Sequence, residues 1–297
     1  MTRIYDWADK NHMRWNRDKF QLLRVGPNRE IKESTYLFTP DFEDVIEEKS
    51  NVKDLGILVD SDLSYKEQMK SAVSKANKKA SWILRTFSNR SVEFMRKTWR
   101  VLVQCHLDYG SVLWAPVNLK GDLKYMEGPL RAFTKKAKNL YNTDYWQRLK
   151  LFKLYSNQRR NERYKILYIW KSLQNIVPSL GLSWNMTGGP RYGPKLTVDP
   201  IYGPNERVKN LKRDSIRNFG VRLFNMLPVT LRVYKGSLQN FKAILDFYLS
   251  QCPDQPPTEE LIPEARDIYG DPSNSLIDWM RITKFVDPTD SVVEAQP

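Results

Sequence analysis

SYKEQMKSAVSKANKKASWILRTF, residues 64–87, carries the clearest structural signal in this chain. Ser64 and Glu67 fit a capping box, in which a hydroxyl and a carboxylate satisfy each other's backbone amides at the start of a helix. Apolar residues then recur every three or four positions, which is the period of an α-helix. The pattern predicts an amphipathic helix with the apolar stripe Met69, Val73, Ala76, Ala80, Ile83 and Phe87 and, on the remaining surface, Lys66, Lys70, Lys75, Lys78 and Lys79.

Further helices are predicted downstream of this one. The next is expected to be capped by Ser91 and to end near Gly110. A bundle of three to five helices is therefore expected, with a separate helical module nearer the C-terminus. The additional predicted helices cover residues 91–109, about 119–138, 146–154, 158–173, 216–227 and 241–249.

Upstream of the bundle, the sequence predicts three short strands. They cover Phe20–Val25, Tyr36–Phe38 and Val52–Asp60, and the first is followed by the turn residues Gly26-Pro27-Asn28. Three short strands form a marginal sheet on their own, so the chain looks as though it begins in the middle of a domain. The predicted fold class is α+β and mainly α, with a short β-sheet remnant, a helical bundle and a C-terminal helical module.

Composition divides the chain into six predicted segments. The segment at 181–210 is rich in Gly and Pro, which is typical of a linker, and the last segment is acidic, contains proline and is expected to be mostly extended. The segments are 1–62 with the strands, 63–145 with the helical bundle, 146–180 as a basic helical extension, 181–210 as a linker, 211–252 as the helical module, and 253–297 as a tail.

Charge indicates the class of partner. The 297 residues contain 48 Lys/Arg and 34 Asp/Glu, a formal net charge of +14, and the tail after Cys252 has a net charge of −7. A basic body favours a polyanion, with nucleic acid ahead of an anionic membrane surface. The sequence has no apolar run long enough for a membrane span, no secretory signal and two cysteines. We expect an intracellular protein of the nucleus or cytoplasm that is not secreted.

The stretch 131–171 is the most basic part of the chain. It contains twelve Lys/Arg and two Asp/Glu, with seven Tyr and Trp residues among them. Basic groups neutralise phosphates and aromatic faces can stack on bases. We interpret the aromatic residues mainly as core and the cations as phosphate contacts. The candidate nucleic-acid-binding residues are Lys75, Lys78, Lys79, Arg131, Lys135, Lys136, Lys138, Arg159, Arg160 and Arg163.

The sequence contains no complete active site. No two aspartates are adjacent, and there are only two histidines, His12 and His106. Phosphoryl transfer by two metal ions needs several carboxylates that converge on the ions. We therefore assign no catalytic residue and no metal ligand to this chain.

Seven segments, taken in order, share a known pattern: 7–20, Lys53–Asp60, Phe87–Arg90, His106–Trp114, Ser215–Phe219, Leu223–Pro228 and Phe241–Asp246. Together they resemble the reverse transcriptases of non-LTR (LINE-type) retrotransposons, in particular those of the jockey and chicken-repeat group. The resemblance runs from about Tyr5 to about Trp279, and its motifs occur in the order found in that family. One departure is Phe224, where the family usually has tryptophan.

This resemblance implies the end of the palm, the thumb and the C-terminal domain of an RNA-directed DNA polymerase. Asn16 and Lys19 would match the palm motif that follows the active site, and Leu55 and Gly56 would lie at the primer grip. The helices from 64 to about 140 would form the thumb. The family's fingers and catalytic aspartates have no counterpart here, so Mg²⁺ is expected only with the complete enzyme. The implied partners are RNA, an RNA–DNA hybrid or DNA, and the missing fingers and palm.

Two alternatives stay open at this point. The chain could be a stand-alone module that binds RNA or an RNA–DNA hybrid through its basic stretch. It could also be the product of a decayed element, because three strands without partners would expose a sheet edge. Whether the chain is itself an enzyme is left undecided, since it resembles a polymerase but has no complete active site.

Overall fold

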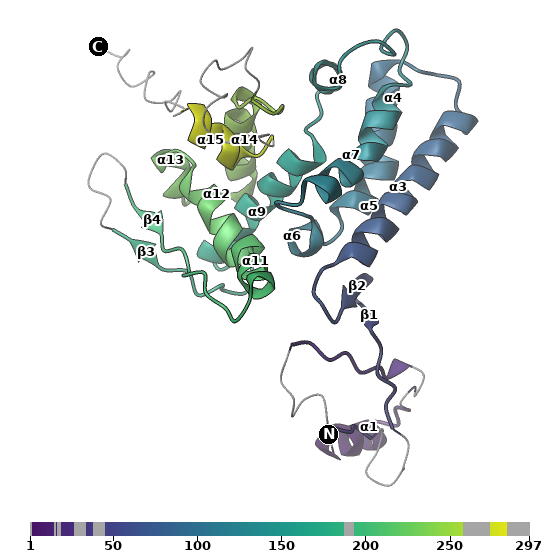
Figure 1. Ribbon diagram of the computed structural model, residues 1–297, viewed down its shortest axis with the longest axis vertical. Helices are drawn as coiled ribbons and strands as arrows, with labels where there is room; N and C mark the ends of the chain where they lie inside the picture. Colours follow the sequence, from purple (N-terminus) through teal and green to yellow (C-terminus); the bar gives the residue numbers. More distant parts are fainter. Residues whose placement is uncertain are drawn as a thin grey trace. The chain divides into compact units, whose positions relative to one another are not determined.

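The computed structural model describes residues 2–14, 16, 19–26, 34–37, 45–186, 193–257 and 274–283. It is mainly helical and contains two small antiparallel sheets, which confirms the prediction of an α+β, mainly α chain (Figure 1). The chain divides into two compact units, Met1–Ser71 and Ala72–Pro297. Within the described residues, no helix has both the length and the hydrophobicity that crossing a bilayer requires.

The first unit contains helix α1 (Thr2–Lys10) and a β-hairpin of β1 (Asn51–Asp54) and β2 (Ile57–Asp60). The prediction of one continuous strand over Val52–Asp60 is therefore wrong. Leu55 and Gly56 have φ angles of +44° and +86°. Positive φ at both central residues is what a two-residue hairpin turn requires, so the chain reverses there.

The other two predicted strands of the first unit are reduced to single bridges. Leu22 pairs with Glu48 in parallel, and Leu37 pairs with Val45 in antiparallel. The prediction of longer strands is wrong for the described residues, because neither segment has a continuous partner along which a ladder of hydrogen bonds could extend. Phe38 lies outside the described residues.

The helix predicted from residues 64–87 is confirmed as α3 (Lys66–Thr86). Its apolar stripe is buried from Met69 to Ile83. The capping box does not form: the Ser64 amide donates to the Asp60 carboxylate at 2.7 Å, and the Ser64 hydroxyl accepts from the Lys66 amide at 3.5 Å rather than from that of Glu67. The side chain of Gln68 accepts from the backbone amide of Leu58 at 3.0 Å, which connects the start of α3 with β2.

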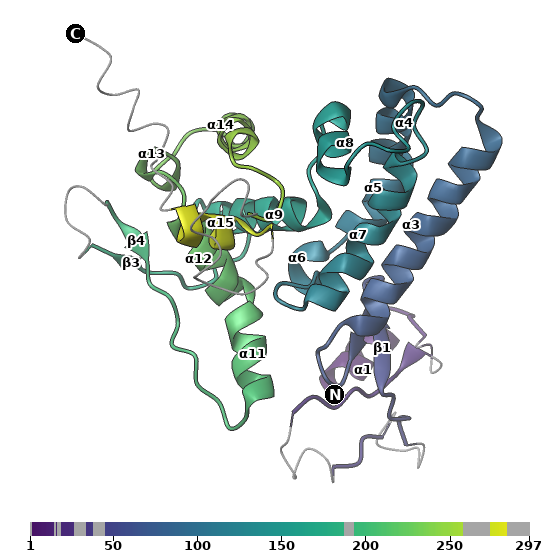
Figure 2. The same ribbon diagram turned by 45° about the horizontal axis from the view of Figure 1, so that its top comes forward.

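The bundle of the second unit continues through the residues after α3. The helix predicted over 91–109 is present, with its middle turn wound as a π-helix, and Ser91 caps it by accepting from the Phe94 amide at 3.4 Å. Figures 1 and 2 show the helices of this stretch beside α3. The elements are α4 (Val92–Thr98), η2 (Trp99–Val103), α5 (Gln104–Asp108), α6 (Ser111–Trp114), α7 (Lys120–Thr134) and α8 (Tyr145–Phe152).

Helix α7 ends earlier than the sequence predicts. The amide of Lys138 donates to the carbonyl of Arg90 at 2.9 Å instead of continuing the helix, and Asn139 has a φ of +64°. Asn139 lies in the turn that follows the helix, and asparagine tolerates this left-handed backbone better than most residues. Lys135, Lys136 and Lys138 therefore lie on a turn rather than on a helix face.

Helix α9 (Asn157–Leu173) belongs both to the bundle and to a second core. Trp170 stacks on Phe241 with ring centroids 4.5 Å apart and an interplanar angle of 10°. The predicted C-terminal helices around Phe219–Leu227 and Phe241–Leu249 pack into this core. The surrounding elements are α11 (Glu206–Asp214), η3 (Ile216–Gly220), α12 (Val221–Asn225), α13 (Val229–Arg232), α14 (Leu238–Gln251) and α15 (Leu276–Thr283).

Parts of the predicted linker and of the acidic tail are folded onto this core. The strands β3 (Trp184–Asn185) and β4 (Lys195–Leu196) pair within the linker, and Leu196 is buried. The Asn225 side chain accepts from the Leu196 amide at 2.7 Å and donates to its carbonyl at 2.8 Å. The expectation of an extended tail is wrong at α15, whose Leu276 is fully buried. Side chains from distant segments supply these docking contacts.

Candidate nucleic-acid interface

The predicted lysines of α3 lie on its solvent-facing side. Lys75 and Lys78 are exposed, and Lys79 is half-buried with its Nζ 5.0 Å from the centroid of the Trp82 ring. Burial, together with the positive charges of Lys75 and Lys79, lowers the pKa of His106 on α5. Helix α3 has six Lys/Arg residues and Glu67 as its one acidic residue. Its exposed face therefore presents positive charge that an anion could neutralise.

A second group of predicted cations lies at the end of α7. Arg131, Lys135, Lys136 and Lys138 are all exposed. The Arg131 guanidinium lies 3.9 Å from the centroid of the Tyr145 ring, while Lys135 Nζ lies 4.3 Å from that of Tyr141. No described carboxylate forms an ion pair with these four cations. Aromatic rings thus position two of the charges without neutralising them.

Arg159 does not belong to this surface, and the prediction that it contacts phosphate is wrong. Its side chain is 0% exposed, and its Nη2 donates to the carbonyls of Pro253 at 2.9 Å and Asn274 at 3.1 Å. Glu162 lies 3.4 Å from its Nε. Replacing Arg159 with alanine would leave Glu162 as an uncompensated buried charge, so such a variant would report on folding and not on phosphate contact.

The other two predicted arginines of α9 form ion pairs. Arg160 contacts Asp108 with an N–O distance of 2.6 Å, and Arg163 contacts Asp246 with one of 2.5 Å. Each guanidinium uses two nitrogens on its carboxylate, a geometry that fixes both side chains. Contact of Arg160 and Arg163 with phosphate stays a prediction. Both arginines also line a cleft, whose walls their ion pairs hold together.

The palm-like and primer-grip-like residues lie in the first unit. The amide of Lys19 donates to the carbonyl of Asn16 at 3.2 Å, so these two residues share one turn, and both are exposed. Leu55 is 84% exposed at the tip of the β1–β2 hairpin, next to Gly56. The rest of the palm-like segment includes Trp15, Arg17 and Asp18, which lie outside the described residues.

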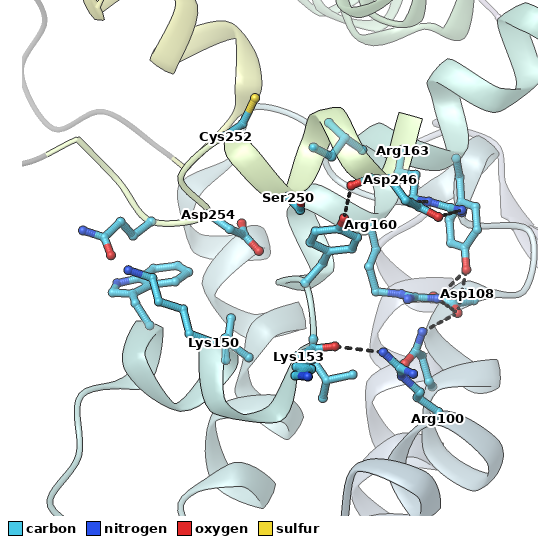
Figure 3. Close-up of a pocket in the computed structure, with 18 of the residues that line it drawn as sticks. Arg100, Asp108, Lys150, Lys153, Arg160, Arg163, Asp246, Ser250, Cys252 and Asp254 are labelled. Atoms are coloured by element: carbon cyan, nitrogen blue, oxygen red, sulfur yellow. Dashed lines mark hydrogen bonds and ion pairs between the residues drawn. The ribbon is translucent and has the colours of Figure 1, made fainter. Parts of the chain in front are cut away.

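The second unit contains a cleft that the sequence did not reveal (Figure 3). Its volume is about 1330 Å³, and residues of η2, α5, α8, α9 and α14 line it together with the segment that follows α14. Three of its cations, Arg100, Lys150 and Lys153, were not predicted. Residues 100–109, 146–164 and 246–255 form the walls. Only the basic stretch 131–171 indicated part of this cleft, since the other walls come from distant segments.

Arg100 lies among other cations in this cleft. Its Nη2 donates to the backbone carbonyl of Lys153 at 2.8 Å. Partial burial, followed by the charges of Arg96 and Arg160, lowers the pKa of the Arg100 guanidinium. An anion that binds beside Arg100 would offset this repulsion and stabilise the charged form of the guanidinium.

Four aromatic residues line the cleft: Tyr109, Trp146, Tyr155 and Tyr164. Burial and the nearby Asp246 carboxylate raise the pKa of Tyr155 to about 12, and its hydroxyl donates to the Asp246 carbonyl at 3.2 Å. Burial also raises the pKa of Tyr164, whose hydroxyl donates to Asp108 at 2.9 Å. Both hydroxyls therefore stay protonated at neutral pH, while half-buried Trp146 presents an indole ring.

Two acidic groups, the half-buried Asp254 and the buried Glu162, attach the C-terminal segment to α9. Asp254 accepts from the amide and hydroxyl of Ser156 at 2.6 and 2.7 Å. Glu162 accepts from the Leu276 amide at 3.1 Å and from the Ser275 hydroxyl at 2.5 Å. Burial raises the pKa of both carboxyl groups, and Arg159 opposes the shift. These groups hold one wall of the cleft in place.

Glu127 joins α7 to α8 and α9 in the same way. It accepts from the hydroxyl of Tyr145 and, at 3.0 Å, from the amide of Asn157. Burial raises the pKa of the Glu127 carboxyl to about 7, against these two hydrogen bonds. Among the described residues, no group of three or more His, Cys, Asp or Glu side chains could hold a metal ion.

Comparison with known proteins leaves the family open. No protein-family model matches the sequence, and no solved structure matches it. Uncharacterized protein B0403.1 of Caenorhabditis elegans is 31% identical over 131 residues, which are 43% of this chain. The match covers 64% of the length of that protein, whose name states no activity.

Proposed function

We propose that this chain is the C-terminal part of a reverse transcriptase of a LINE-type mobile element. Its role would be to bind the RNA template and primer duplex with the helices that follow residue 64. The nucleotidyl transfer itself would belong to the complete enzyme, whose Mg²⁺ and catalytic aspartates are expected in the missing palm.

The observation that carries this proposal is the double array of exposed cations on α3 and at the end of α7. Lys75 and Lys78 project from a helix whose opposite face is buried, and Arg131 and Lys135 are held against aromatic rings. Cations held on a rigid scaffold without carboxylate partners can bind phosphates and release their counterions. A thumb that clasps a duplex needs a surface of this kind.

The local structure of one resembling segment supports the same interpretation. In His106–Trp114, Gly110 has a φ of +64° between α5 and α6, and the Trp114 indole donates to the Tyr109 carbonyl at 2.7 Å. Asp108 accepts from Arg160. Glycine, tryptophan and the acidic residue each have a structural use at their positions, which explains why these residue types occur together.

The binding test compares two triple variants that change the net charge equally. Lys75→Gln, Lys78→Gln and Lys79→Gln removes the α3 charges, and Lys124→Gln, Lys195→Gln and Lys235→Gln removes three exposed charges elsewhere. Anisotropy of a labelled RNA–DNA hybrid should show the slope of log affinity against log salt falling by about three units in the α3 variant. An α3 variant that behaves like the control would contradict the proposed duplex surface.

The catalytic part of the proposal has its own test. The purified chain is incubated with an RNA template, a DNA primer, deoxynucleotides and Mg²⁺, and primer extension is measured on a gel. We expect no cDNA above background, because the chain lacks paired aspartates. Extension by this chain alone would show that it contains an active site, and the proposed role as a binding part would then be wrong.

A further inference from the structure

Three cations of the cleft lack a carboxylate partner among the described residues. Lys150 and Lys153 are exposed residues of the α8 end, and Arg100 donates to a backbone carbonyl rather than to an acid. Figure 3 shows Lys150 and Lys153 across the cavity from Ser250 and Cys252 of the α14 end. Three unpaired charges that line one cavity from two elements favour an anionic occupant.

The acidic residues of the described cleft lining are already paired. Asp108 accepts from Arg160 and from the Tyr164 hydroxyl, and Asp246 accepts from both Nε and Nη2 of Arg163. Asp254 is held by Ser156. These carboxylates cannot neutralise the three cations without breaking bonds that fix the walls. The charge available to a ligand is therefore positive.

The size and walls of the cleft indicate the class of anion. At about 1330 Å³ the cavity exceeds the roughly 300–1,000 Å³ of pockets that enclose small molecules. Trp146 lies in the wall, and aromatic faces of this kind stack on unpaired bases. A base-paired duplex has no unstacked base to offer, whereas a single strand presents phosphates and bases together.

We propose that the cleft binds a single-stranded stretch of nucleic acid, with phosphates on Arg100, Lys150 and Lys153 and a base on Trp146. The inference deepens the proposed function and rests on it, because it assigns the unpaired template to a surface distinct from the duplex surface of α3. The Arg131 guanidinium also lies 5.3 Å from the centroid of the Trp146 ring. A strand that leaves the cleft past Trp146 therefore meets the cations at the end of α7.

The test uses the full chain and a labelled single-stranded 12-mer of uridine. The cleft variant is Lys150→Gln with Lys153→Asn. Asparagine tolerates the left-handed backbone of residue 153, whose φ is +49°, and the Arg100 hydrogen bond is kept because its acceptor is the backbone. The control is Lys124→Gln with Lys235→Gln, which makes the same change in net charge outside the cleft.

We expect the cleft variant to bind the single strand about tenfold more weakly than the control at 100 mM salt, and to bind an RNA–DNA hybrid within about twofold of it. Trp146→Leu should weaken binding of the single strand about fivefold or more. Equal affinities of cleft variant and control for the single strand would overturn the proposal. An equal loss on the hybrid would also overturn it, because the cleft would then be part of the duplex surface.

The two proposals fail in different ways in this experiment. A wild-type chain that binds the hybrid but not the 12-mer would leave the duplex surface standing and overturn the cleft proposal. A chain that binds only the 12-mer, with loss in the cleft variant, would support the cleft and contradict a template–primer clasp. Thermal unfolding of each variant checks that the fold is retained, and Lys153→Asn alone provides a milder variant if the double one unfolds.

Discussion

The guanidinium of Arg100 donates a 2.8 Å hydrogen bond to the backbone carbonyl of Lys153, 53 residues later in the chain. This bond connects the π-helical turn η2 to the end of α8, where Lys153 has a left-handed backbone. Because the acceptor is a carbonyl, the charge of Arg100 is not neutralised and the Lys153 side chain is not used. One contact thus shapes the cleft and leaves its positive charge available.

Replacing Arg100 with glutamine tests whether this residue binds a phosphate in addition to holding the end of α8. We expect weaker binding of a single-stranded 12-mer, by about threefold to tenfold, because one phosphate contact is lost. The free energy of unfolding should fall by no more than about 1 kcal/mol, since Arg100 is exposed and the bond to Lys153 is a single one. Anisotropy and urea unfolding measure the two effects. A change in stability with unaltered affinity would restrict Arg100 to a structural role.

Glu127 should make the stability of the chain depend on pH. Its pKa is raised to about 7 in the folded chain from an ordinary value of 4.5. The folded state then binds more protons than the unfolded state between these values, so the free energy of unfolding falls as pH rises from 4.5 to 7. The loss is on the order of 3 kcal/mol or less.

Glu127→Gln removes this titration and keeps an oxygen that can accept from Tyr145 and Asn157. Urea unfolding of both proteins at pH 5 and pH 8 measures the difference. We expect the wild type to lose more stability than the variant over this interval. Carboxyls that do not interact with Glu127 titrate equally in both proteins, so parallel pH profiles would contradict the assigned shift.

A variant of Leu55 distinguishes a purely structural role of the β1–β2 turn from the contact with a primer that the primer-grip resemblance implies. Its φ of +44° is unfavourable for leucine, whereas asparagine is preferred at this position of a two-residue hairpin turn. Leu55→Asn should stabilise the chain by about 0.5–1 kcal/mol in urea unfolding. If Leu55 also contacts the primer end, as the primer-grip resemblance implies, the same variant should bind a template–primer hybrid more weakly. Unchanged hybrid binding would restrict Leu55 to its turn.

Leu276 tests whether the C-terminal segment is part of the folded core. It is fully buried, and its amide donates to Glu162. Leu276→Ala should lower the free energy of unfolding by about 2–5 kcal/mol, as expected when a buried leucine leaves a cavity. An unaltered midpoint of chemical unfolding would show that this segment does not contribute to the stability of the chain.

The sequence predicted the helices well because their signal is local. The stripe from Met69 to Ile83 and the Ser91 cap depend on residues within a few turns of one another. The strand over Val52–Asp60 was wrong because Leu55 adopts a turn conformation that leucine rarely takes. Periodicity carries no information on such a φ angle.

The site was harder to predict because distant segments build it. Lys75, Lys78 and the α7 cations are exposed as expected. Arg159 is buried because Glu162 and carbonyls at 253 and 274 surround it. Glu162 is the i+3 neighbour of Arg159 on one helix, but the carbonyl partners of Arg159 and the bond from Arg100 to Lys153 could not be read from spacing alone.

The most direct test of nucleic-acid binding is the salt dependence of affinity for a labelled RNA–DNA hybrid, measured by anisotropy between 50 and about 200 mM salt. Binding through the α3 and α7 cations predicts a log–log slope of several units, because each phosphate contact releases counterions. A steep negative slope supports the account. No binding at the lowest salt, or an affinity that does not change with salt, would contradict it.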